Sequence, residues 1–389
     1  MRIAIDYTAA IRQGAGIGVY VRNLVDALLA QDASNQYTLL TSGKASPEHS
    51  FPHARNVQGR NIFIPDRYLN ILWYRLHAPI PATLFTGTID IYHGPDFVLP
   101  PLGRRVRKVV TIHDLAFLEH PEYAVPSLAA YLRKVVPEAI AAADIVTTVS
   151  SEVSRTLIKH FQTPPEKLIV VPLGVSHYFR RVTDPLLLDA TRYKFGLKHP
   201  LILAVGTQEP RKNHSGLIKA FHKAQKEKNG PAMLAIAGGT GWLYEETQQL
   251  VKELNLENKV RFLGRVTDHE LVTLYSSAEI FAFPSFFEGF GIPPIEAMAC
   301  GAPVITSNTS SLPEVAGDAA LLIDPYSVDE LADAIIRLTK DEGLREELRQ
   351  KGYQRVKQFS WEVSARKMLT LYQQLYQGQT NFSEEVGVR

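Results

Sequence analysis

The chain of 389 residues alternates short apolar segments with amphipathic ones, and it does so twice. In the first half, segments of strand length lie at residues 2–6, 37–42, 89–93, 108–114, 144–150 and 167–175, and helical periodicity runs through 18–30 and 127–143. The pattern restarts at residue 200, with strand-like segments at 200–207, 232–239, 259–264, 279–285, 303–307 and 320–324. Continuous apolar runs such as PLILAVGT are typical of parallel strands that helices cover on both faces. The sequence therefore predicts an α/β protein with two doubly wound parallel sheets.

A chain of this length exceeds what a single hydrophobic core usually spans, so two domains are expected, at residues 1–180 and 181–360. The mixed, polar segment Ser176–Pro200 is the expected linker. An amphipathic segment near Ser360 to Tyr376 opens a last piece, residues 361–389, which is expected to cross back onto the first domain. Ligands of such sheets bind beyond the carboxyl ends of the strands, which favours an active site in a cleft between the two domains.

Composition excludes several classes of protein. The chain has 42 Lys and Arg against 40 Asp and Glu, a balance that does not favour nucleic-acid binding. The first residues, MRIAIDYTAA, reach Asp6 too early for the apolar core of a signal peptide, and no apolar run approaches the ~20 residues of a membrane span. A cytoplasmic location is expected, with peripheral contact at the inner face of the membrane left open. Cys300 lies in an apolar run and is expected to be a buried, inert thiol.

The segment FEGFGIPPIEAMACGAPVITS follows a predicted strand directly. Gly289 and Gly291 let the backbone approach a ligand closely, and free N–H groups at a helix start favour anions. Pro293 and Pro294 suit the first turn of a helix, where a missing N–H costs nothing. The segment therefore predicts a strand, a glycine loop and a helix start that together cradle a phosphate.

Charged residues near this loop have two readings each. Glu296 is either an acid in the first turn of the helix, favoured by the helix dipole, or a group that binds ribose hydroxyls. Glu288 is either a solvated loop acid or a sugar contact. Arg211 and Lys212 begin a predicted helix, where positive charge opposes the dipole, so an anionic partner for this pair is expected.

The two glutamates, with seven residues between them, resemble the E-x7-E signature of retaining glycosyltransferases of family 4. Further segments resemble that family in order and spacing, densely from 201 to 369: VGTQEPRKN, GRV, SSLPEVAGDAALLIDP and FSWEVSARKML. The resemblance is looser in the first half, at GAGIGVY, TIHDL and ADIVTTVS. It implies the GT-B fold, in which two Rossmann-like domains face a central cleft.

The resemblance also implies roles for individual residues. Glu296 would hold the ribose and Glu288 would lie beside the donor sugar, while Arg211 and Lys212 would clamp the diphosphate. Thr207 departs from the family, because many members have Arg after the glycine that Gly206 represents. The donor-binding residues implied are Gly16, Gly18, Gly206, Arg211, Lys212, Gly264, Arg265, Val266, Glu288, Gly289, Phe290, Gly291, Ile292 and Glu296.

Residues of the first half contribute a second group of candidates. The loop with Gly16 and Gly18 would face the donor phosphates or the acceptor. The position of His113 resembles that of a family histidine near the reacting sugar, so the implied catalytic set is His113, Glu288, Arg211 and Lys212. Asp114 is expected to orient its loop, and His93 is a weaker candidate.

Metal ligands are lacking in the sequence, which has no D-x-D motif and no Cys/His cluster. We therefore expect no metal and no cofactor beyond a nucleotide-diphosphate sugar as co-substrate, with UDP-glucose and GDP-mannose as the two candidates. The segments Arg60–Pro81 and Gly103–Lys108 mix basic and aromatic residues. They are either contacts for an anionic lipid headgroup or lipid-linked diphosphate, or simply solvated surface.

The resemblance implies a retaining hexosyltransferase that moves glucose or mannose to a glycan or polyprenyl-linked acceptor in polysaccharide biosynthesis. One alternative is a nucleotide-sugar epimerase on the same fold. The other is a nucleotide-sugar-binding protein without turnover.

Overall fold

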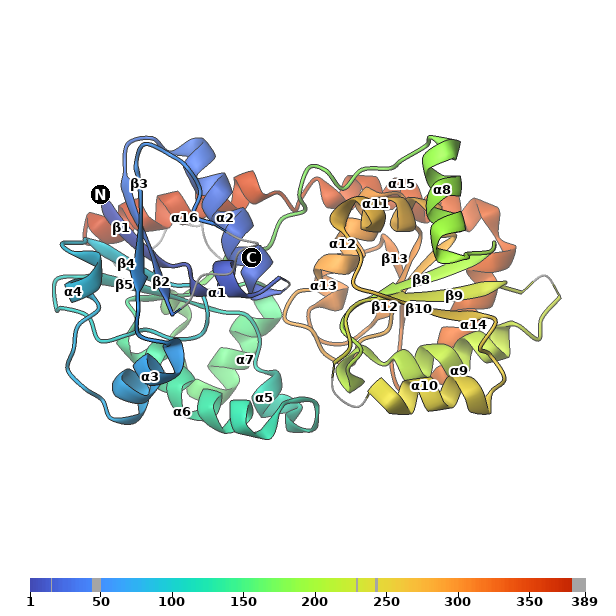
Figure 1. Ribbon diagram of the computed structural model, residues 1–389, viewed down its shortest axis with the longest axis horizontal. Coiled ribbons are helices and arrows are strands. Elements are labelled where there is room, and N and C mark those ends of the chain that lie inside the picture. Colours follow the sequence, from blue (N-terminus) through green and yellow to red (C-terminus); the bar gives the residue numbers. More distant parts are fainter. Residues whose placement is uncertain (15, 44–49, 229, 242–243, 380–389) are drawn as a thin grey trace. The chain divides into compact units, whose positions relative to one another are not determined.

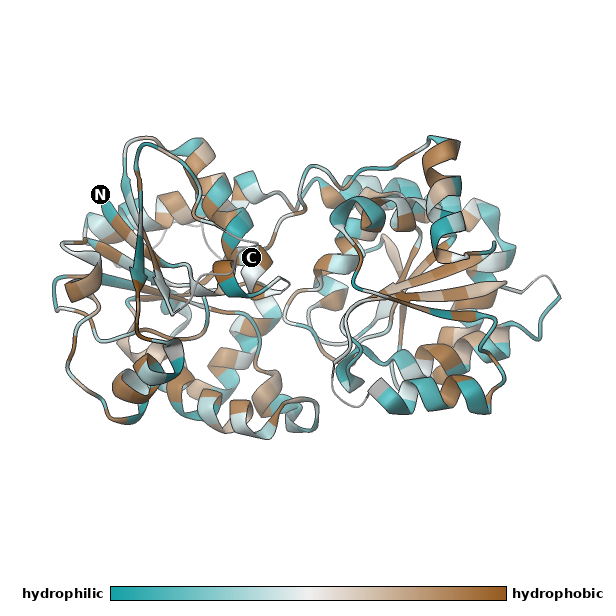
Figure 2. Ribbon diagram, viewed as in Figure 1, coloured by the Kyte–Doolittle hydropathy of each residue, from teal (hydrophilic) through white to brown (hydrophobic). Residues whose placement is uncertain are grey.

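The computed structural model describes residues 1–14, 16–43, 50–228, 230–241 and 244–379, and it divides into two compact units (Figure 1). Unit 1 comprises Met1–Gly174 together with the chain from Trp361 onward, and unit 2 comprises Val175–Ser360. The expected domain boundary at residue 180 therefore falls inside unit 2. Each unit is built around one parallel sheet, and Figure 2 shows hydrophobic residues concentrated in the strands and on helix faces.

The sheet of unit 1 has seven parallel strands. In spatial order they are β3 (Val57–Ile62), β2 (Gln36–Ser42), β1 (Arg2–Asp6), β4 (Ile91–Gly94), β5 (Arg107–Ile112), β6 (Ile145–Thr148) and β7 (Leu168–Val170). The sequence predicted all of these except β3, whose residues VQGRNI are mostly exposed. This strand lies at the sheet edge and pairs only with β2, so it carries no apolar pattern that could reveal it.

The helices of unit 1 flank this sheet. They are α1 (Thr8–Arg12), α2 (Ile17–Gln31), α3 (Asp66–Asn70), the π-helical turn η1 (Ile71–Arg75), α4 (Thr83–Thr86), α5 (Ala116–Glu119), the short turn η2 (Pro121–Tyr123), α6 (Pro126–Ala142), α7 (Ser151–Phe161), the short turn η3 (Pro165–Lys167) and α16 (Trp361–Tyr376). At the start of α2, a Cβ on Gly18 would lie 2.1 Å from the Gln13 carbonyl oxygen. Close packing between α1 and α2 therefore requires glycine at this position.

The C-terminal helix α16 is joined to the sheet of unit 1 by a buried polar network. Tyr372 Oη lies 2.7 Å from His93 Nδ1, and His93 Nε2 lies 2.8 Å from Thr111 Oγ1. Thr111 in turn contacts Thr147 Oγ1 at 2.8 Å. Both ring nitrogens of His93 are engaged, and burial lowers its pKa to about 3. His93 is therefore a neutral structural residue, and its candidacy for the active site was wrong.

The sheet of unit 2 has six parallel strands, all at predicted positions. In spatial order they are β10 (Val260–Gly264), β9 (Met233–Ala237), β8 (Leu201–Val205), β11 (Ile280–Phe283), β12 (Val304–Ser307) and β13 (Ala320–Ile323). The helical elements are α8 (Pro185–Phe195), the 3-10 turn η4 (Pro210–Lys212), α9 (His214–Ala224), α10 (Tyr244–Glu253), α11 (Asp268–Ser277), α12 (Ile292–Ala299), α13 (Leu312–Ala316), α14 (Val328–Lys340) and α15 (Glu342–Val356).

Local signals explain where these helices begin. Helix α8 lies inside the segment expected to be a linker; Asp184 accepts a hydrogen bond from Leu186 N (2.9 Å) and so caps it. Thr267 and Glu270 form a complete capping box at the start of α11, since Glu270 Oε2 also accepts from Thr267 N (2.7 Å). At the start of α14 only half of such a box forms: Ser327 Oγ accepts from Glu330 N, but the Glu330 carboxylate accepts from Asp324 N.

The strand order of unit 2 reverses at β8, which lies between β9 and β11. Connections after β8 and β11 therefore leave the sheet in different directions, and in doubly wound sheets ligands bind in the crevice at this point. In this unit the loop after β8 carries Arg211 and Lys212, and the loop after β11 carries Glu288. The fold thus places the three charged candidates beside one another.

Candidate active site

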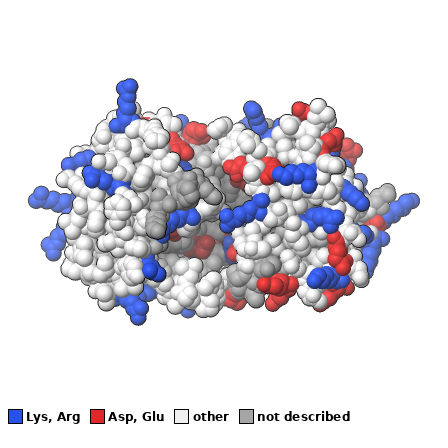
Figure 3. All heavy atoms as spheres, viewed as in Figure 1, with Lys and Arg blue, Asp and Glu red and all other residues white. Residues whose placement is uncertain are grey.

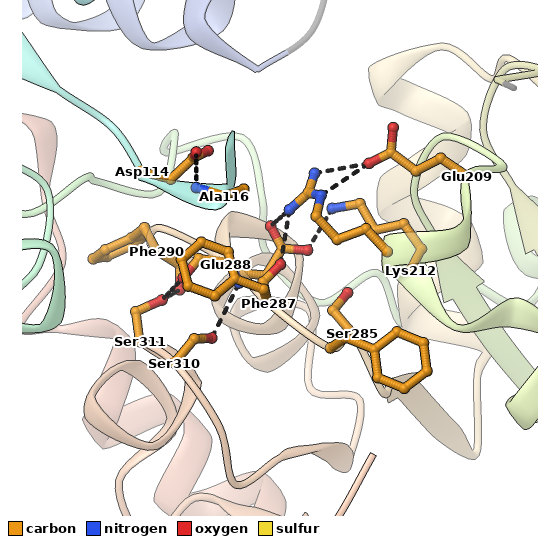
Figure 4. Close-up of polar contacts among 12 residues, drawn as sticks. Asp114, Ala116, Glu209, Lys212, Ser285, Phe287, Glu288, Phe290, Ser310 and Ser311 are labelled. Atoms are coloured by element: carbon orange, nitrogen blue, oxygen red, sulfur yellow. Dashed lines mark hydrogen bonds and ion pairs between the residues drawn. The ribbon is translucent and has the colours of Figure 1, made fainter. Parts of the chain in front are cut away.

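Arg211, Lys212 and Glu288 form one ion-paired cluster in unit 2 (Figure 4). Arg211 Nη1 donates to Glu288 Oε2 at 2.7 Å, and Lys212 Nζ donates to Glu288 Oε1 at 2.5 Å. Arg211 Nη1 also donates to the Phe287 carbonyl at 2.9 Å. Each oxygen of the Glu288 carboxylate therefore has its own cationic partner.

A second carboxylate, Glu209, completes the cluster. Arg211 donates to Glu209 Oε1 through both Nε (3.1 Å) and Nη2 (2.8 Å). Two cations and two carboxylates lie together, so their formal charges cancel. The anionic partner expected for Arg211 and Lys212 is thus supplied, in this structure, by the chain itself.

The Glu288 side chain is buried and ionised. Burial raises the pKa of this carboxyl group, but Arg211 and Lys212 outweigh burial and lower it to about 2. Burial and the Arg211 charge lower the pKa of Lys212. The reading of Glu288 as a solvated loop acid is wrong, because the residue is only 8% exposed.

Hydroxyl groups that follow β12 hold the loop around Glu288 in place (Figure 4). Ser310 Oγ accepts from Glu288 N at 3.0 Å. Ser311 Oγ lies 2.8 Å from the Glu288 carbonyl and 2.9 Å from the Phe290 carbonyl. Thr309 Oγ1 donates to the Phe286 carbonyl at 3.0 Å. Sequence reasoning matched this segment to the family but missed its role, although three consecutive hydroxyl residues after a strand were a usable signal.

Helix α12 starts as the sequence predicted, with Pro293 and Pro294 in its first turn. Gly291 precedes it with a φ of 101°, a conformation that side chains other than glycine rarely adopt. Since the helix begins at Ile292, Glu296 falls in the second turn, and the prediction of a first-turn acid was wrong. Tyr275 Oη donates to Glu296 Oε2 at 3.1 Å, and burial raises the pKa of Glu296 to about 8. Glu296 is therefore protonated at neutral pH in this structure.

The remaining donor-binding candidates of unit 2 follow the carboxyl ends of β8 and β10. The aliphatic stem of Lys212 crosses Gly206, where a Cβ would lie 3.4 Å from three of its carbons. Arg265, which follows Gly264 at the end of β10, lies over Gly239, where a Cβ would come 3.2 Å from its Nε. Val266 is next along the chain. Lys212 and Arg265 thus bring positive charge to one edge of the sheet.

Two buried polar atoms on the site loops have no hydrogen-bond partner within the described parts of the chain. They are Gln208 Oε1, in the loop after β8, and Ser285 Oγ, in the loop after β11. Unsatisfied buried polar groups are rare and costly in native proteins. Neither residue was a candidate at the level of sequence, because nothing in either segment marks a buried, unpaired side chain.

The other candidates, Gly16, Gly18 and His113, belong to unit 1. His113 follows β5 and is buried, and its Nε2 donates to the Pro95 carbonyl at 2.7 Å. Burial lowers its pKa, so the ring is neutral. Gly16 caps α2 with open space where a Cβ would be, whereas packing against α1 accounts for Gly18. Asp114 Oδ1 accepts from Ala116 N (3.0 Å), which confirms that it orients its loop (Figure 4).

Other features agree with a site built without cysteine chemistry. Cys300 is fully buried, as predicted, and burial raises its pKa. Within the described residues, no three His, Cys, Asp or Glu side chains come together in a way that could hold a metal ion. The helices among those residues are all too short or too polar to cross a membrane.

Solved structures similar to this chain show which fold it has. Sucrose-phosphate synthase from Thermosynechococcus elongatus superposes with a TM-score of 0.76 at 22% identity, covering 97% of this chain and 100% of that one. The Anabaena protein HepE, solved in complex with UDP and glucose, gives a TM-score of 0.72 at 18% identity, with 96% and 99% covered. At such identities the likeness concerns the fold alone. The chain has the GT-B fold that the sequence motifs implied.

Sequence comparison identifies the family. The model described as glycosyl transferases group 1 matches residues 189–355, and that of glycosyltransferase family 4 matches residues 14–178. O-antigen chain mannosyltransferase B of Escherichia coli is 37% identical over 286 residues, which cover 73% of this chain and 74% of that protein. The chain belongs to the group 1 glycosyltransferases, and the family inferred from the E-x7-E motif is confirmed.

Proposed function

We propose that the chain is a retaining mannosyltransferase of polysaccharide biosynthesis. It transfers the sugar of a nucleotide-diphosphate sugar to a glycan or polyprenyl-linked acceptor at the inner face of the membrane. The observation that carries the proposal is the cluster of Arg211, Lys212 and Glu288 at the point where the unit 2 sheet reverses. The E. coli relative, which is named as an O-antigen chain mannosyltransferase, supports mannose and polysaccharide.

The cluster fits the departure of a diphosphate. As the glycosidic bond breaks, negative charge grows on the leaving phosphate, and fixed cations such as Arg211 and Lys212 stabilise it. The acceptor hydroxyl attacks the anomeric carbon from the same face, and its proton passes to the leaving phosphate. One C–O bond is broken, one C–O bond is formed and one proton is transferred, so the step needs no covalent enzyme intermediate.

Glu288 is better suited to binding than to acid–base chemistry. Its pKa of about 2 keeps it ionised at neutral pH. It therefore holds the two cations and accepts hydrogen bonds from hydroxyl groups of the donor sugar. A nucleotide-sugar epimerase would need a carboxyl group beside the reacting carbon that exchanges protons near neutrality. The low pKa of Glu288 therefore argues against this residue as the acid or base of an epimerase.

The donor-binding set that we propose extends around this cluster. Glu296 binds the ribose, the backbone of Gly289–Ile292 contacts the donor, and Arg265 lies where the base or diphosphate would pass. GDP-mannose is the first candidate donor and UDP-glucose the second. Because the cationic side chains supply the charge that a metal ion would otherwise provide, we propose that transfer is independent of metal.

A donor panel tests the function. The full-length chain is incubated with GDP-mannose, UDP-glucose and related donors, together with a polyprenyl-diphosphate-linked sugar as acceptor, in excess EDTA. Mass spectrometry of the acceptor and NMR of the anomeric proton are expected to show one added hexose with the donor's anomeric configuration. Conversion of one nucleotide sugar into another would instead establish an epimerase, and binding without turnover would establish a sensor. Activity that returns only with Mg²⁺ or Mn²⁺ would overturn the metal-free proposal.

A further inference from the structure

Exposed apolar side chains gather in one segment of unit 1. Of the eighteen large apolar residues that are exposed in the described chain, seven lie between Phe63 and Leu84. These seven are Phe63, Ile64, Tyr68, Ile71, Leu76, Ile80 and Leu84. Phe63 is 90% exposed, Leu84 70% and Leu76 64%. So dense a group in one short stretch indicates an interaction surface, since single exposed apolar residues are ordinary but clusters are not.

Two of these side chains, Tyr68 and Ile71, lie on the helical stretch formed by α3 and η1, and the other five lie before or after it. Tyr68, Ile71 and Arg75, on α3 and η1, follow one another at spacings of three and four residues, and all three are exposed. On the other face Trp73 is buried, with its ring centroid 6.4 Å from that of Phe85 and Nε1 donating to the Ile80 carbonyl at 2.9 Å. The outer face is therefore held outward by the packing of the inner one, and Figure 2 shows hydrophobic and hydrophilic positions side by side on α3.

Positive charge accompanies the apolar face. The stretch from Arg60 to Pro81 contains three arginines and one aspartate, a formal charge of +2 that equals that of the whole chain. Arg60, Arg67 and Arg75 are exposed, and no described carboxylate forms an ion pair with any of them. The Arg67 guanidinium lies 4.6 Å from the centroid of the Tyr68 ring, so charge and aromatic surface are presented together.

We propose that the segment Phe63–Leu84 docks unit 1 on the surface of an anionic lipid bilayer. An amphipathic helix that carries aromatic and aliphatic residues beside arginines lies in the plane of a membrane interface, with its apolar face in the headgroup boundary and its cations at the lipid phosphates. A second copy of this chain is a poorer occupant, because a symmetric contact would set the same arginines against one another. The inference extends the proposed function, since a polyprenyl-linked acceptor is itself held in a bilayer.

Vesicle co-sedimentation of the full-length chain tests the proposal without any donor or acceptor, so its outcome is independent of the donor panel above. Binding is expected to vesicles of phosphatidylglycerol with phosphatidylcholine, to be weaker on phosphatidylcholine alone, and to fall as salt is added. The double variant Arg67→Gln with Arg75→Gln is expected to lower binding to anionic vesicles by about fivefold for each arginine. The triple variant Phe63→Ser, Ile71→Ser and Leu76→Ser is expected to lower it by at least about tenfold.

A matched control comes from α8 in unit 2, which exposes Leu186, Leu187 and Tyr193 beside charges of both signs. The triple serine variant of these three residues is expected to bind vesicles like the unchanged chain. All variants alter exposed side chains, and circular dichroism melting curves confirm that each is folded. Equal loss in the α8 variant, or no binding of the unchanged chain to anionic vesicles, would overturn the proposal. A concentration-dependent dimer that the Phe63–Leu76 variant abolishes would overturn it in favour of a second copy.

Discussion

The two units share one architecture, yet the points at which their sheets reverse carry different chemistry. In unit 2, between β8 and β11, two cations and two carboxylates lie within hydrogen-bonding distance and cancel each other. In unit 1, β1 lies beside β4; Asp6 is the last residue of β1 and Asp96 follows β4, and burial together with the Asp6 carboxylate raises the pKa of Asp96 to about 7. The same sheet topology therefore supports a charge-compensated cluster in one unit and an acidic edge in the other, because function resides in the loops.

The two units also differ in net charge. Unit 1 carries 20 Lys and Arg against 17 Asp and Glu, whereas unit 2 carries 22 against 23. Figure 3 shows Lys and Arg projecting from the rim of unit 1 in the view drawn. In unit 2 the cations Arg211 and Lys212 are partly buried and paired with glutamate, whereas the arginines of the Phe63–Leu84 segment in unit 1 and its vicinity are exposed beside apolar residues. Five predictions sharpen this contrast.

The largest effect is expected where buried charges compensate one another. Glu288→Gln leaves Arg211 and Lys212 without their shared carboxylate, so it should lower the free energy of unfolding by about 3–5 kcal/mol. Because the pKa of Glu288 in the folded chain, about 2, lies below its ordinary 4.5, ionised Glu288 stabilises the fold above pH 4.5 and this contribution is lost as pH falls toward 2. Urea denaturation between pH 7 and pH 3 should show that the variant lacks this part of the acid sensitivity.

A surface pair provides the control for that experiment. Glu227→Gln removes the partner of Lys340 (2.7 Å), and both of these side chains are about half exposed. Such pairs contribute roughly 0–1 kcal/mol. If both variants lost the same free energy of unfolding, the Glu288 cluster would stabilise unit 2 no more than an exposed ion pair does.

The next effect concerns turnover. Lys212→Ala should lower kcat by a factor on the order of 10²–10³, since one fixed charge beside the leaving diphosphate is removed. Lys219→Ala, on the exposed side of the adjacent helix α9, should leave kcat unchanged. Steady-state kinetics with saturating donor separates the two. A wild-type kcat for Lys212→Ala with only a raised KM would assign this lysine to ground-state binding.

Sequence reasoning succeeded where a pattern is local and failed where contacts are distant. Apolar runs predicted the strands of unit 2, because the four central strands β8, β9, β11 and β12 are buried on both faces. The exposed edge strand β3 and helix α8, hidden in a polar stretch, had no such pattern.

The pairing of Glu288 with Lys212 joins residues 76 positions apart. Sequence analysis assigned both to a donor site, but it gave Lys212 the donor diphosphate as its anionic partner and did not predict the pairing with Glu288. The adjacency of β8 and β11 creates this contact, and the reversal rule for doubly wound sheets could have predicted it. Gln208 Oε1 and Ser285 Oγ lack hydrogen-bond partners because of how the surrounding chain packs, and no sequence motif encodes that packing.

A smaller effect is expected at Glu296. Glu296→Ala should weaken binding of the free nucleoside diphosphate by about 1–3 kcal/mol, because the ribose hydroxyls lose their neutral hydrogen-bond partner and are left unsatisfied. Titration calorimetry measures this, and unchanged affinity together with a lower melting temperature would reduce Glu296 to a structural residue.

The raised pKa of Glu296 also gives a pH signature. Between its ordinary 4.5 and about 8, the folded chain holds a proton that the unfolded chain releases, so this group destabilises the fold progressively as pH rises through that window. Glu296→Gln lacks the effect. Its melting temperature relative to the unchanged chain should therefore increase from pH 5 to pH 8.5, and a constant difference would contradict the assignment.

The smallest effect is expected in unit 1, where the network of His93, Thr111 and Tyr372 is neutral. Tyr372→Phe removes the hydroxyl that contacts His93 Nδ1 and should cost about 0.5–1.5 kcal/mol of unfolding free energy, the net value of one hydrogen bond. Tyr376→Phe is the control, since Tyr376 lies one turn further along α16 and is 56% exposed. Because the pKa of folded His93 is about 3, the loss should be the same from pH 8 down to pH 5. Urea denaturation at both pH values measures it. A loss that changes with pH would show that His93 titrates in this range and would contradict the neutral network.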